Sequence, residues 1–400
     1  FVLSIAFVWG TAACAGGTQT PSSAPAQQAA GTQEKNEEGA GAGSGVIKIG
    51  AVLPMTGPAA VFGQKFQEAY AMALEEINAN GGVKGKKLDV VIEDSQEQPQ
   101  LGTTATEKLA NDPEILVLTG GRSSGVTLAM AKVANDNRIP YLIEHGSSDT
   151  ATRSGWDYVF RLNPTSGMYT EALRNYLDEV VQPQKVAWLQ VDNAFGDAVY
   201  EFGLKDYFAS RDFEVLHEKY SADALDLKAV MTKVRHFAPD VVIMTSGTDN
   251  EAVQIMKAAK EAGVTPKAFI GTGAGHSIQG FWDQDSSLAQ YVMTSGPWHG
   301  DKKQEAWQRF AKKFEETYGH APGEHEVEGY VAIYVLADAL ERAVSLEREA
   351  VKEALAATDL QTIFGRVKFE DFDGYRNQNR PVTELSQWID GQLVTVYPDE

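Results

Sequence analysis

From residue 46 onward, short runs of apolar residues alternate with segments in which apolar residues recur every three or four positions. Continuous apolar runs predict buried strands, and the recurrent spacing predicts amphipathic helices between them. We expect strands at 47–53, 88–92, 115–119, 139–143, 185–191 and 240–245, and helices at about 66–77, 126–133, 197–210 and 249–262. This alternation predicts parallel sheets that are covered by helices on both faces.

The alternation forms two successive series, which separate near residue 164. A further helical stretch, at about 303–357, must return to one of them. Open parallel sheets bind ligands at the carboxyl ends of their strands. The pattern therefore predicts an α/β chain with two doubly wound parallel-sheet lobes, which enclose a small ligand between them by hinge closure.

The first 45 residues have a different composition. Residues 1–13, FVLSIAFVWGTAA, predict a secretory signal peptide, because they are apolar, end in small residues and are too few to span a bilayer. Cys14 then stands where a lipoprotein signal peptidase would cleave, so we expect it to be lipidated; a buried cysteine is the alternative. Residues 14–45 are rich in Gly, Ala, Ser, Gln and Pro and predict a disordered linker. The folded part should lie outside the cytoplasm and contact the membrane through its lipid anchor only.

Charge and composition narrow the function. The chain has 35 basic and 55 acidic residues, a formal net charge of -20, which argues against nucleic acid as a partner. A single cysteine allows no disulfide within the chain, and the seven histidines have no convincing ligand spacing, so no metal is predicted. The chain lacks a G-x-S-x-G motif, and His325 lacks the second histidine of a zinc-protease helix. We predict a protein that is not an enzyme and uses no cofactor.

The stretch IGTGAGH, at 270–276, places three glycines in five positions after an apolar run. A dinucleotide-binding loop needs its third glycine three positions after the second and a helix directly afterwards. Here the third glycine follows after two positions, and residues 277–280 begin no clear helix. A cofactor-binding loop is therefore not expected.

Four segments carry a resemblance to a known family: IKIGAVLPMTGPAAVFGQ (47–64), AMALEEINANGGVKGKKLDVVIED (71–94), NRIPYLIEHGSSDTATRSGWDYVFRLNPT (137–165) and GYVAIYVLADALERA (329–343). On these segments the chain resembles the periplasmic leucine/isoleucine/valine-binding proteins, the solute-binding components of ABC importers. The resemblance implies the type I periplasmic binding protein fold with a three-crossover hinge. It implies a monomer that delivers its ligand to ABC permease subunits, with lobe 1 formed by 46–164 plus 297–372 and lobe 2 by 165–296 plus 373–400.

The turn TGGRSSGVT, at 119–127, joins a predicted strand to a helix. Ser123 or Ser124 can cap that helix, and its free N–H groups and dipole favour an anion. The resemblance implies that this turn holds the carboxylate of the ligand, with Ser124 at the matching serine position. Arg122 could add a bidentate clamp on the carboxylate or be an ordinary surface arginine.

The polar loop EHGSSD, at 144–149, follows the next predicted strand. The resemblance places Ser147 on a family threonine that contacts both the carboxylate and the ammonium of the ligand. The backbone at His145 and Gly146 lies beside that position.

Three aromatic residues complete the expected ligand contacts. Phe62 matches a family aromatic at the cleft rim, and Phe195 matches a family tyrosine of the second lobe. Both can pack against a ligand, but neither can hydrogen-bond to it. Trp298 lies near a predicted crossover and is a further contact candidate.

One family feature is missing. The resemblance places the acid that pairs with the ligand's ammonium at Gly273, and a ligand-facing tyrosine at Gly247. A buried ammonium without a counter-charge is destabilising by several kcal/mol. Either another acid takes over, with Glu326, Asp249 and Glu144 as candidates, or the ligand has no free amine.

We predict, in line with the family resemblance, that the ligand is an apolar, branched-chain type amino acid. An amine-free aromatic or aliphatic carboxylate is the alternative. The same fold could also serve as a sensing receptor for amides, but the N-terminal position of the tether favours transport.

Overall fold

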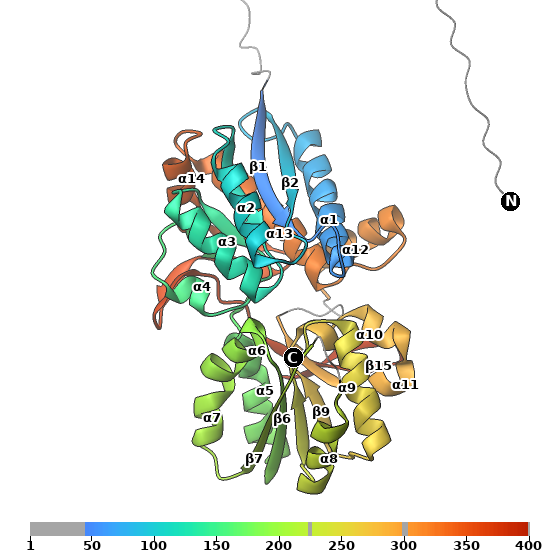
Figure 1. The fold of residues 1–400 in the computed structure, drawn as a ribbon. Coiled ribbons are helices and arrows are strands. Elements are labelled where there is room, and N and C mark those ends of the chain that lie inside the picture. Colours follow the sequence, from blue (N-terminus) through green and yellow to red (C-terminus); the bar gives the residue numbers. More distant parts are fainter. Residues whose placement is uncertain (1–44, 223–225, 298–302, 399–400) are drawn as a thin grey trace, which may run out of the picture. The chain divides into compact units, whose positions relative to one another are not determined.

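The computed structural model describes residues 45–222, 226–297 and 303–398, and these residues build two α/β lobes (Figure 1). The sheet of the first lobe has the strand order β13-β14-β5-β4-β3-β1-β2. Its strands are β1 (Val46–Leu53), β2 (Lys87–Asp94), β3 (Ile115–Gly120), β4 (Tyr141–Ile143), β5 (Val159–Arg161), β13 (Glu370–Phe372) and β14 (Tyr375–Gln378). All pairs are parallel except β13 with β14.

The second lobe has a sheet of the same size, in the order β16-β15-β10-β9-β8-β6-β7. Its strands are β6 (Lys185–Val191), β7 (Glu214–Tyr220), β8 (Val241–Met244), β9 (Ala268–Gly271), β10 (Met293–Gly296), β15 (Glu384–Ile389) and β16 (Gln392–Tyr397). β15 pairs antiparallel with both β10 and β16. Both sheets are therefore mixed rather than wholly parallel. The β13–β14 and β15–β16 pairs are hairpins, and strands joined by a tight turn can pair only in the antiparallel sense.

Helices cover both faces of the first sheet. They are α1 (Ala60–Ala79), α2 (Pro99–Ala110), α3 (Ser124–Asp136), α4 (Thr150–Arg153), α12 (Glu305–Tyr318), α13 (Glu324–Arg342) and α14 (Arg348–Ala356). Leu53 belongs to a core with α1 and α13, whereas the adjacent Val52 belongs to a core with α2 and α3. Since neighbouring side chains point to opposite faces, a strand buried on both faces is apolar along its buried part, as β1 is from Ile49 to Leu53. The returning helical stretch thus completes the first lobe.

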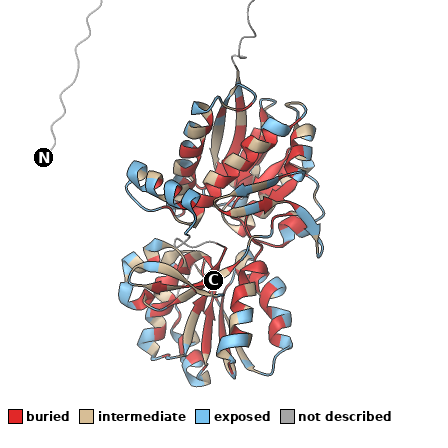
Figure 2. Cartoon of the chain, turned by 180° about the vertical axis from the view of Figure 1, so that it is seen from behind, coloured by how far each residue is buried: buried red, intermediate tan, exposed pale blue. Residues whose placement is uncertain are grey.

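The second lobe repeats this layering, and Figure 2 shows buried residues gathered in the interior of each lobe. Its helices are α5 (Glu171–Tyr176), α6 (Ala194–Val199), α7 (Lys205–Ala209), α8 (Lys228–Phe237), α9 (Asp249–Ala262), α10 (Gln279–Gln284) and α11 (Ser286–Ala289). Short helical turns occur at Met168–Thr170, Leu177–Val181, Tyr200–Leu204 and Ala274–His276, and β11 (Asp359–Thr362) forms a hairpin with β12 (Gly365–Lys368). The helix predicted at 197–210 is thereby divided into α6, a wider turn and α7.

The chain passes between the two sheets three times: after β5, between β10 and α12, and between β14 and β15. The predicted lobe boundary after residue 372 falls inside the β13–β14 hairpin, and both strands of that hairpin belong to the first sheet. The structure therefore places the third passage later, at 379–383. The sequence could not assign this hairpin to a lobe, because its residues are mostly polar and partly exposed and form no apolar run.

The predicted signal peptide, the predicted lipidation site at Cys14 and most of the predicted linker lie outside the described residues. They remain predictions. Within the part of the chain that the structure does describe, every helix is too short or too polar to cross a bilayer.

Candidate functional site

A hollow of about 290 Å³ lies where loops at the carboxyl ends of strands from both sheets meet. This is the place where open α/β sheets bind ligands. Its lining residues are Glu97, Pro99, Arg122, Ser123, Ser124, Gly125, Val126, His145, Ser147, Tyr169, Asn193, Ala194, Phe195, Gly247, Thr248, Glu251 and Ala274. Five residues selected from the sequence are thus brought together here: Arg122, Ser124, His145, Ser147 and Phe195.

The turn before α3 presents the start of that helix to the hollow. Gly121 has φ +85°, and a Cβ there would lie 2.7 Å from the Thr127 hydroxyl, so only glycine fits this sharp turn. Ser123 is the N-cap residue, but its side chain makes no capping bond. The first residues of α3 line the hollow, their N–H groups have no side-chain acceptor among the described residues, and the helix dipole makes this end attractive to an anion. Ser124, 4% exposed, adds its hydroxyl to the same end.

The loop after β4 contributes a second hydroxyl. Ser147 Oγ lies 3.0 Å from Ser166 Oγ, and the backbone N–H of Ser166 donates to the Ser147 carbonyl. Gly146 does not line the hollow. Its N–H donates to Gly121 O at 3.1 Å, and a Cβ at this residue would collide with Thr127. Gly146 therefore allows the two loops to approach closely.

Arg122 connects the two lobes. Its Nη1 donates to Glu97 Oε1 at 2.9 Å, and its Nη2 donates to the carbonyl of Gly247 in the second lobe at 2.6 Å. The ring of Phe62 lies 3.6 Å from the guanidinium carbon, a cation–π contact. Phe62 was expected at the cleft rim, but it is buried beneath Arg122 and does not line the hollow.

The second lobe supplies an acid to the hollow. Glu251 lies in the first turn of α9, where its N–H is capped by Thr248 Oγ1 at 3.2 Å. Its Oε2 accepts bonds from the Gly247 N–H at 3.1 Å and from the Tyr220 hydroxyl at 3.3 Å. Among the described residues no lysine or arginine forms an ion pair with this carboxylate. Glu251 is 7% exposed, so it is a buried acid, and in the part of the chain that the structure describes it has no cationic partner.

None of the three acids suggested by the sequence lines the hollow. Glu326 is fully buried, pairs with Lys65 at 2.6 Å and caps the Gly323 N–H at 3.0 Å. Glu144 accepts bonds from Tyr70 and Thr119, and burial raises its pKa to about 7. Asp249 accepts a bond from a glutamine of α10.

Two other acids, Glu97 and Glu251, line the hollow instead, and neither was selected from the sequence. Glu251 had a usable signal, since Thr248-x-x-Glu251 is the pattern of a capping box. Glu97 follows the carboxyl end of β2 and had no comparable signal.

The glycine-rich stretch at 270–276 forms the end of β9 and a short helical turn. Gly273 has φ +74°, and a Cβ there would lie 2.9 Å from the ring of Tyr169, so a glycine is needed to leave room for that ring. Gly273 itself does not line the hollow. His276 is fully buried, with Nδ1 2.9 Å from Ser246 Oγ. Burial lowers the pKa of His276 to about 3. The stretch is therefore a packed turn that carries Ala274 to the site. Trp298 lies outside the described residues.

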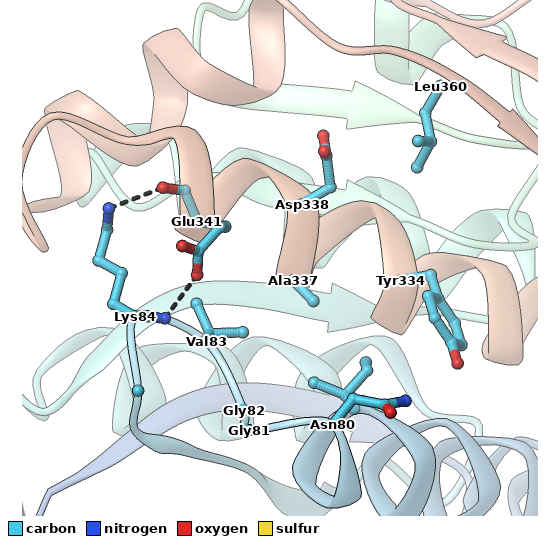
Figure 3. A pocket seen from close by; sticks show the side chains of 12 residues that line it. Asn80, Gly81, Gly82, Val83, Lys84, Tyr334, Ala337, Asp338, Glu341 and Leu360 are labelled. Carbon is cyan, nitrogen blue, oxygen red and sulfur yellow. Dashed lines mark hydrogen bonds between the residues drawn. The ribbon is translucent and has the colours of Figure 1, made fainter. Parts of the chain in front are cut away.

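A larger hollow, of about 480 Å³, lies elsewhere in the first lobe, between the α1–β2 turn and α13 (Figure 3). Lys84 borders it and donates its Nζ to the Glu341 carbonyl at 2.7 Å. This hollow adjoins the amino end of β2, whereas ligands of such sheets bind at the carboxyl ends. The smaller hollow is therefore the candidate functional site.

Comparisons with known proteins agree with this geometry. Residues 46–390 match the periplasmic binding protein family. The chain belongs to this family. It is accordingly a transport binding protein, the substrate-binding component of an ABC transporter, and not an enzyme.

Three similar proteins illustrate the range within the fold. The Leu/Ile/Val-binding protein homolog 7 of Brucella melitensis is 28% identical over 384 residues, which are 90% of this chain and 94% of that protein. The substrate-binding protein LivJ of Streptococcus pneumoniae, solved with isoleucine, has a TM-score of 0.77 at 22% identity, covering 88% of this chain and 100% of that one. A solute-binding protein of R. palustris, solved with benzoate, has a TM-score of 0.77 at 21% identity, covering 88% and 96%.

Proposed function

We propose that this binding protein captures a free amino acid with an apolar side chain, and that it holds the two charged groups at opposite walls of the hollow. The α-carboxylate meets the N–H groups at the start of α3, together with the Ser124 and Ser147 hydroxyls. The α-ammonium meets Glu251 in the second lobe. The observation that carries the proposal is this pairing of a positive helix end in one lobe with a buried acid in the other that has no cationic partner among the described residues.

The charges of the lining favour a zwitterion. Arg122 is the cation of the hollow, and Glu97 already neutralises it at 2.9 Å. Glu251 has no such partner among the described residues, so a ligand without a positive charge would leave it uncompensated. An amino acid satisfies both walls at once.

The remaining lining favours an apolar side chain. Pro99 and Val126 come from the first lobe, and Ala194 and Phe195 come from the second. A hollow of about 290 Å³ that combines such surfaces with a few polar groups suits a small ligand. The Brucella relative is named for leucine, isoleucine and valine, which agrees with this class.

An amine-free aromatic carboxylate is the second candidate. Phe195 and Tyr169 line the hollow and could flank a ring, and residue 273 carries no acid. The R. palustris protein of the same fold was solved with benzoate. In this alternative the carboxylate still lies at α3, but Glu251 accepts bonds from the Gly247 N–H and the Tyr220 hydroxyl and contacts no ligand amine.

We further propose that the chain is lipidated at Cys14 and works outside the cytoplasm as a membrane-anchored monomer that delivers its ligand to permease subunits. The apolar segment before Cys14 and the polar linker after it support this arrangement. Mass spectrometry of the membrane-extracted protein should find acyl chains on Cys14, and an unmodified cysteine would contradict the anchor.

Thermal denaturation with matched ligand pairs tests the ligand class. Each pair differs only in the amine: leucine against 4-methylpentanoate, and phenylalanine against 3-phenylpropanoate, with benzoate added. We expect stabilisation by one or more amino acids and none by their deaminated partners. Stabilisation by carboxylates alone would reject the amino acid and favour the second candidate.

A further inference from the structure

A second group of chemically versatile side chains lies beside the hollow. His145 follows β4, while Glu324 and Glu328 occupy the first two turns of α13. Because they are four residues apart on a helix, both glutamates lie on the face that meets His145. One ligand atom of each residue lies within 4.8 Å of the other two, and we call these three residues the His–Glu cluster.

The contacts within the His–Glu cluster leave acceptors unused. His145 Nδ1 lies 2.7 Å from Glu328 Oε2, whereas Glu328 Oε1 has no partner among the described residues although the side chain is fully buried. Glu324 receives only hydroxyl donors, from Tyr169 at 3.1 Å and from Ser277 at 3.4 Å. A buried carboxylate is strongly disfavoured unless a cation or several donors compensate it.

The nearby cations are engaged elsewhere. Lys65 pairs with Glu326 at 2.6 Å, and Arg122 pairs with Glu97 at 2.9 Å. His325 stacks on His145 with ring centroids 4.2 Å apart, and its buried Nε2 also lacks a partner among the described residues. The His–Glu cluster therefore combines one imidazole and two carboxylates, and no lysine or arginine of the described ranges pairs with them.

We propose that His145, Glu324 and Glu328 bind a divalent transition-metal ion of the zinc class. One imidazole nitrogen with carboxylate oxygens is a donor set that zinc accepts at about 2.0–2.2 Å. Tetrahedral binding at these lengths sets ligand atoms about 3.3 Å apart, so the pair now 2.7 Å apart would separate slightly and ligand atoms up to 4.8 Å apart would approach one another. This proposal differs from the prediction, made from histidine spacing along the sequence, that the chain binds no metal.

Three protein ligands leave a coordination position open. His145 also lines the hollow, so the open position can hold water or a donor atom of the bound solute. The ion would then fix the loop after β4 to α13 and complete one wall of the site. The proposal does not depend on the identity of the solute.

Equilibrium dialysis of the tag-free full chain against Zn²⁺, followed by elemental analysis, tests the site. We expect one equivalent of zinc in the wild type, and a loss of affinity of at least about 100-fold in both E324Q and E328Q. The control is H320Q, which removes an exposed histidine that pairs with a single glutamate, Glu68, at 3.0 Å; it should bind zinc as the wild type does.

Circular dichroism of each variant shows whether it has folded, and E324Q keeps the test valid should E328Q unfold, since Glu324 is only partly buried. Substitution of Co²⁺ for Zn²⁺ should give a visible absorption spectrum in the wild type and lose it in E324Q. The proposal is overturned if metal-stripped wild type takes up less than one equivalent of zinc, or if folded E324Q and E328Q bind it unchanged. The first result would mean that protons rather than a metal ion neutralise the two carboxylates, and the second that zinc binds at another place. Neither would alter the outcome of the ligand panel.

Discussion

Replacement of Glu251 by glutamine is the sharpest change the site offers, because it removes one negative charge and almost no volume. The amide oxygen can still accept from the Gly247 N–H, and Thr248 can still cap α9, so the turn should persist. The Tyr220 hydroxyl retains its other acceptor, the Thr245 carbonyl at 2.6 Å. The principal loss is therefore the counter-charge that we assign to the ligand's ammonium.

The expected loss of affinity follows from burial. Removing one partner of a buried, hydrogen-bonded charge pair weakens binding by about 2–3 kcal/mol, which corresponds to roughly 30- to 150-fold in Kd. Glu251 is 7% exposed, so solvent provides little screening of that pair. Isothermal titration calorimetry with the amino acid that stabilises the wild type most should show this change.

Asp249→Asn is the matched control. Asp249 begins the same helix and carries the same charge, but it does not line the hollow. We expect its Kd to stay within about twofold of the wild type, as for an ordinary surface change. Equal losses of affinity in E251Q and D249N would indicate that any negative charge near the site has the same long-range electrostatic effect. An unchanged Kd in folded E251Q would refute the assignment of the ammonium to Glu251.

Three further predictions concern the first lobe, the contact between lobes and the packed turn. Ser124→Ala should weaken binding of amino acids and amine-free carboxylates alike by about 1–3 kcal/mol by calorimetry, since the hydroxyl serves the carboxylate; an unchanged Kd would remove Ser124 from the site. Arg122→Gln removes the charged donor to Gly247 O, and stopped-flow measurements should show faster ligand release by roughly tenfold or more, whereas an unchanged release rate would exclude this contact from holding the lobes together. The folded-state pKa of His276 is about 3 and an unfolded histidine titrates near 6.5, so the unfolded state binds more protons below pH 6.5 and stability falls as the pH falls. Between pH 7 and pH 5 the unfolding free energy of the wild type should drop by about 2 kcal/mol more than that of H276Q, and parallel pH profiles in urea denaturation would contradict this.

The sequence was most informative where burial is continuous. The runs that predicted β1, β3 and β6 are apolar because helices cover both faces, and the 249–262 periodicity coincides with α9. The strands β13, β14 and β16 were not predicted because they lie toward the sheet edges, where exposed positions interrupt the apolar pattern. The neighbouring β15 has no exposed position, but its polar residues Glu384, Ser386 and Gln387 interrupt the apolar run.

The candidate site shows the same limit. Ser124 and Ser147 follow strands directly, so their place at a sheet edge could be expected from the chain order alone. The positions of Phe62 and Glu251 could not, because each depends on a neighbour distant in sequence: Phe62 supports Arg122, and Glu251 is held by Tyr220. Sequence spacing gives the elements that reach the hollow, whereas packing decides which side chains line it.

A ligand-bound structure is the most direct test of the central claim, that the hollow holds an amino acid across the two lobes. We predict a carboxylate within hydrogen-bonding distance of Ser124 and the first N–H groups of α3, and an amine within about 3 Å of Glu251. A ligand bound with its amine directed away from Glu251, or a bound carboxylate with no amine, would contradict the account.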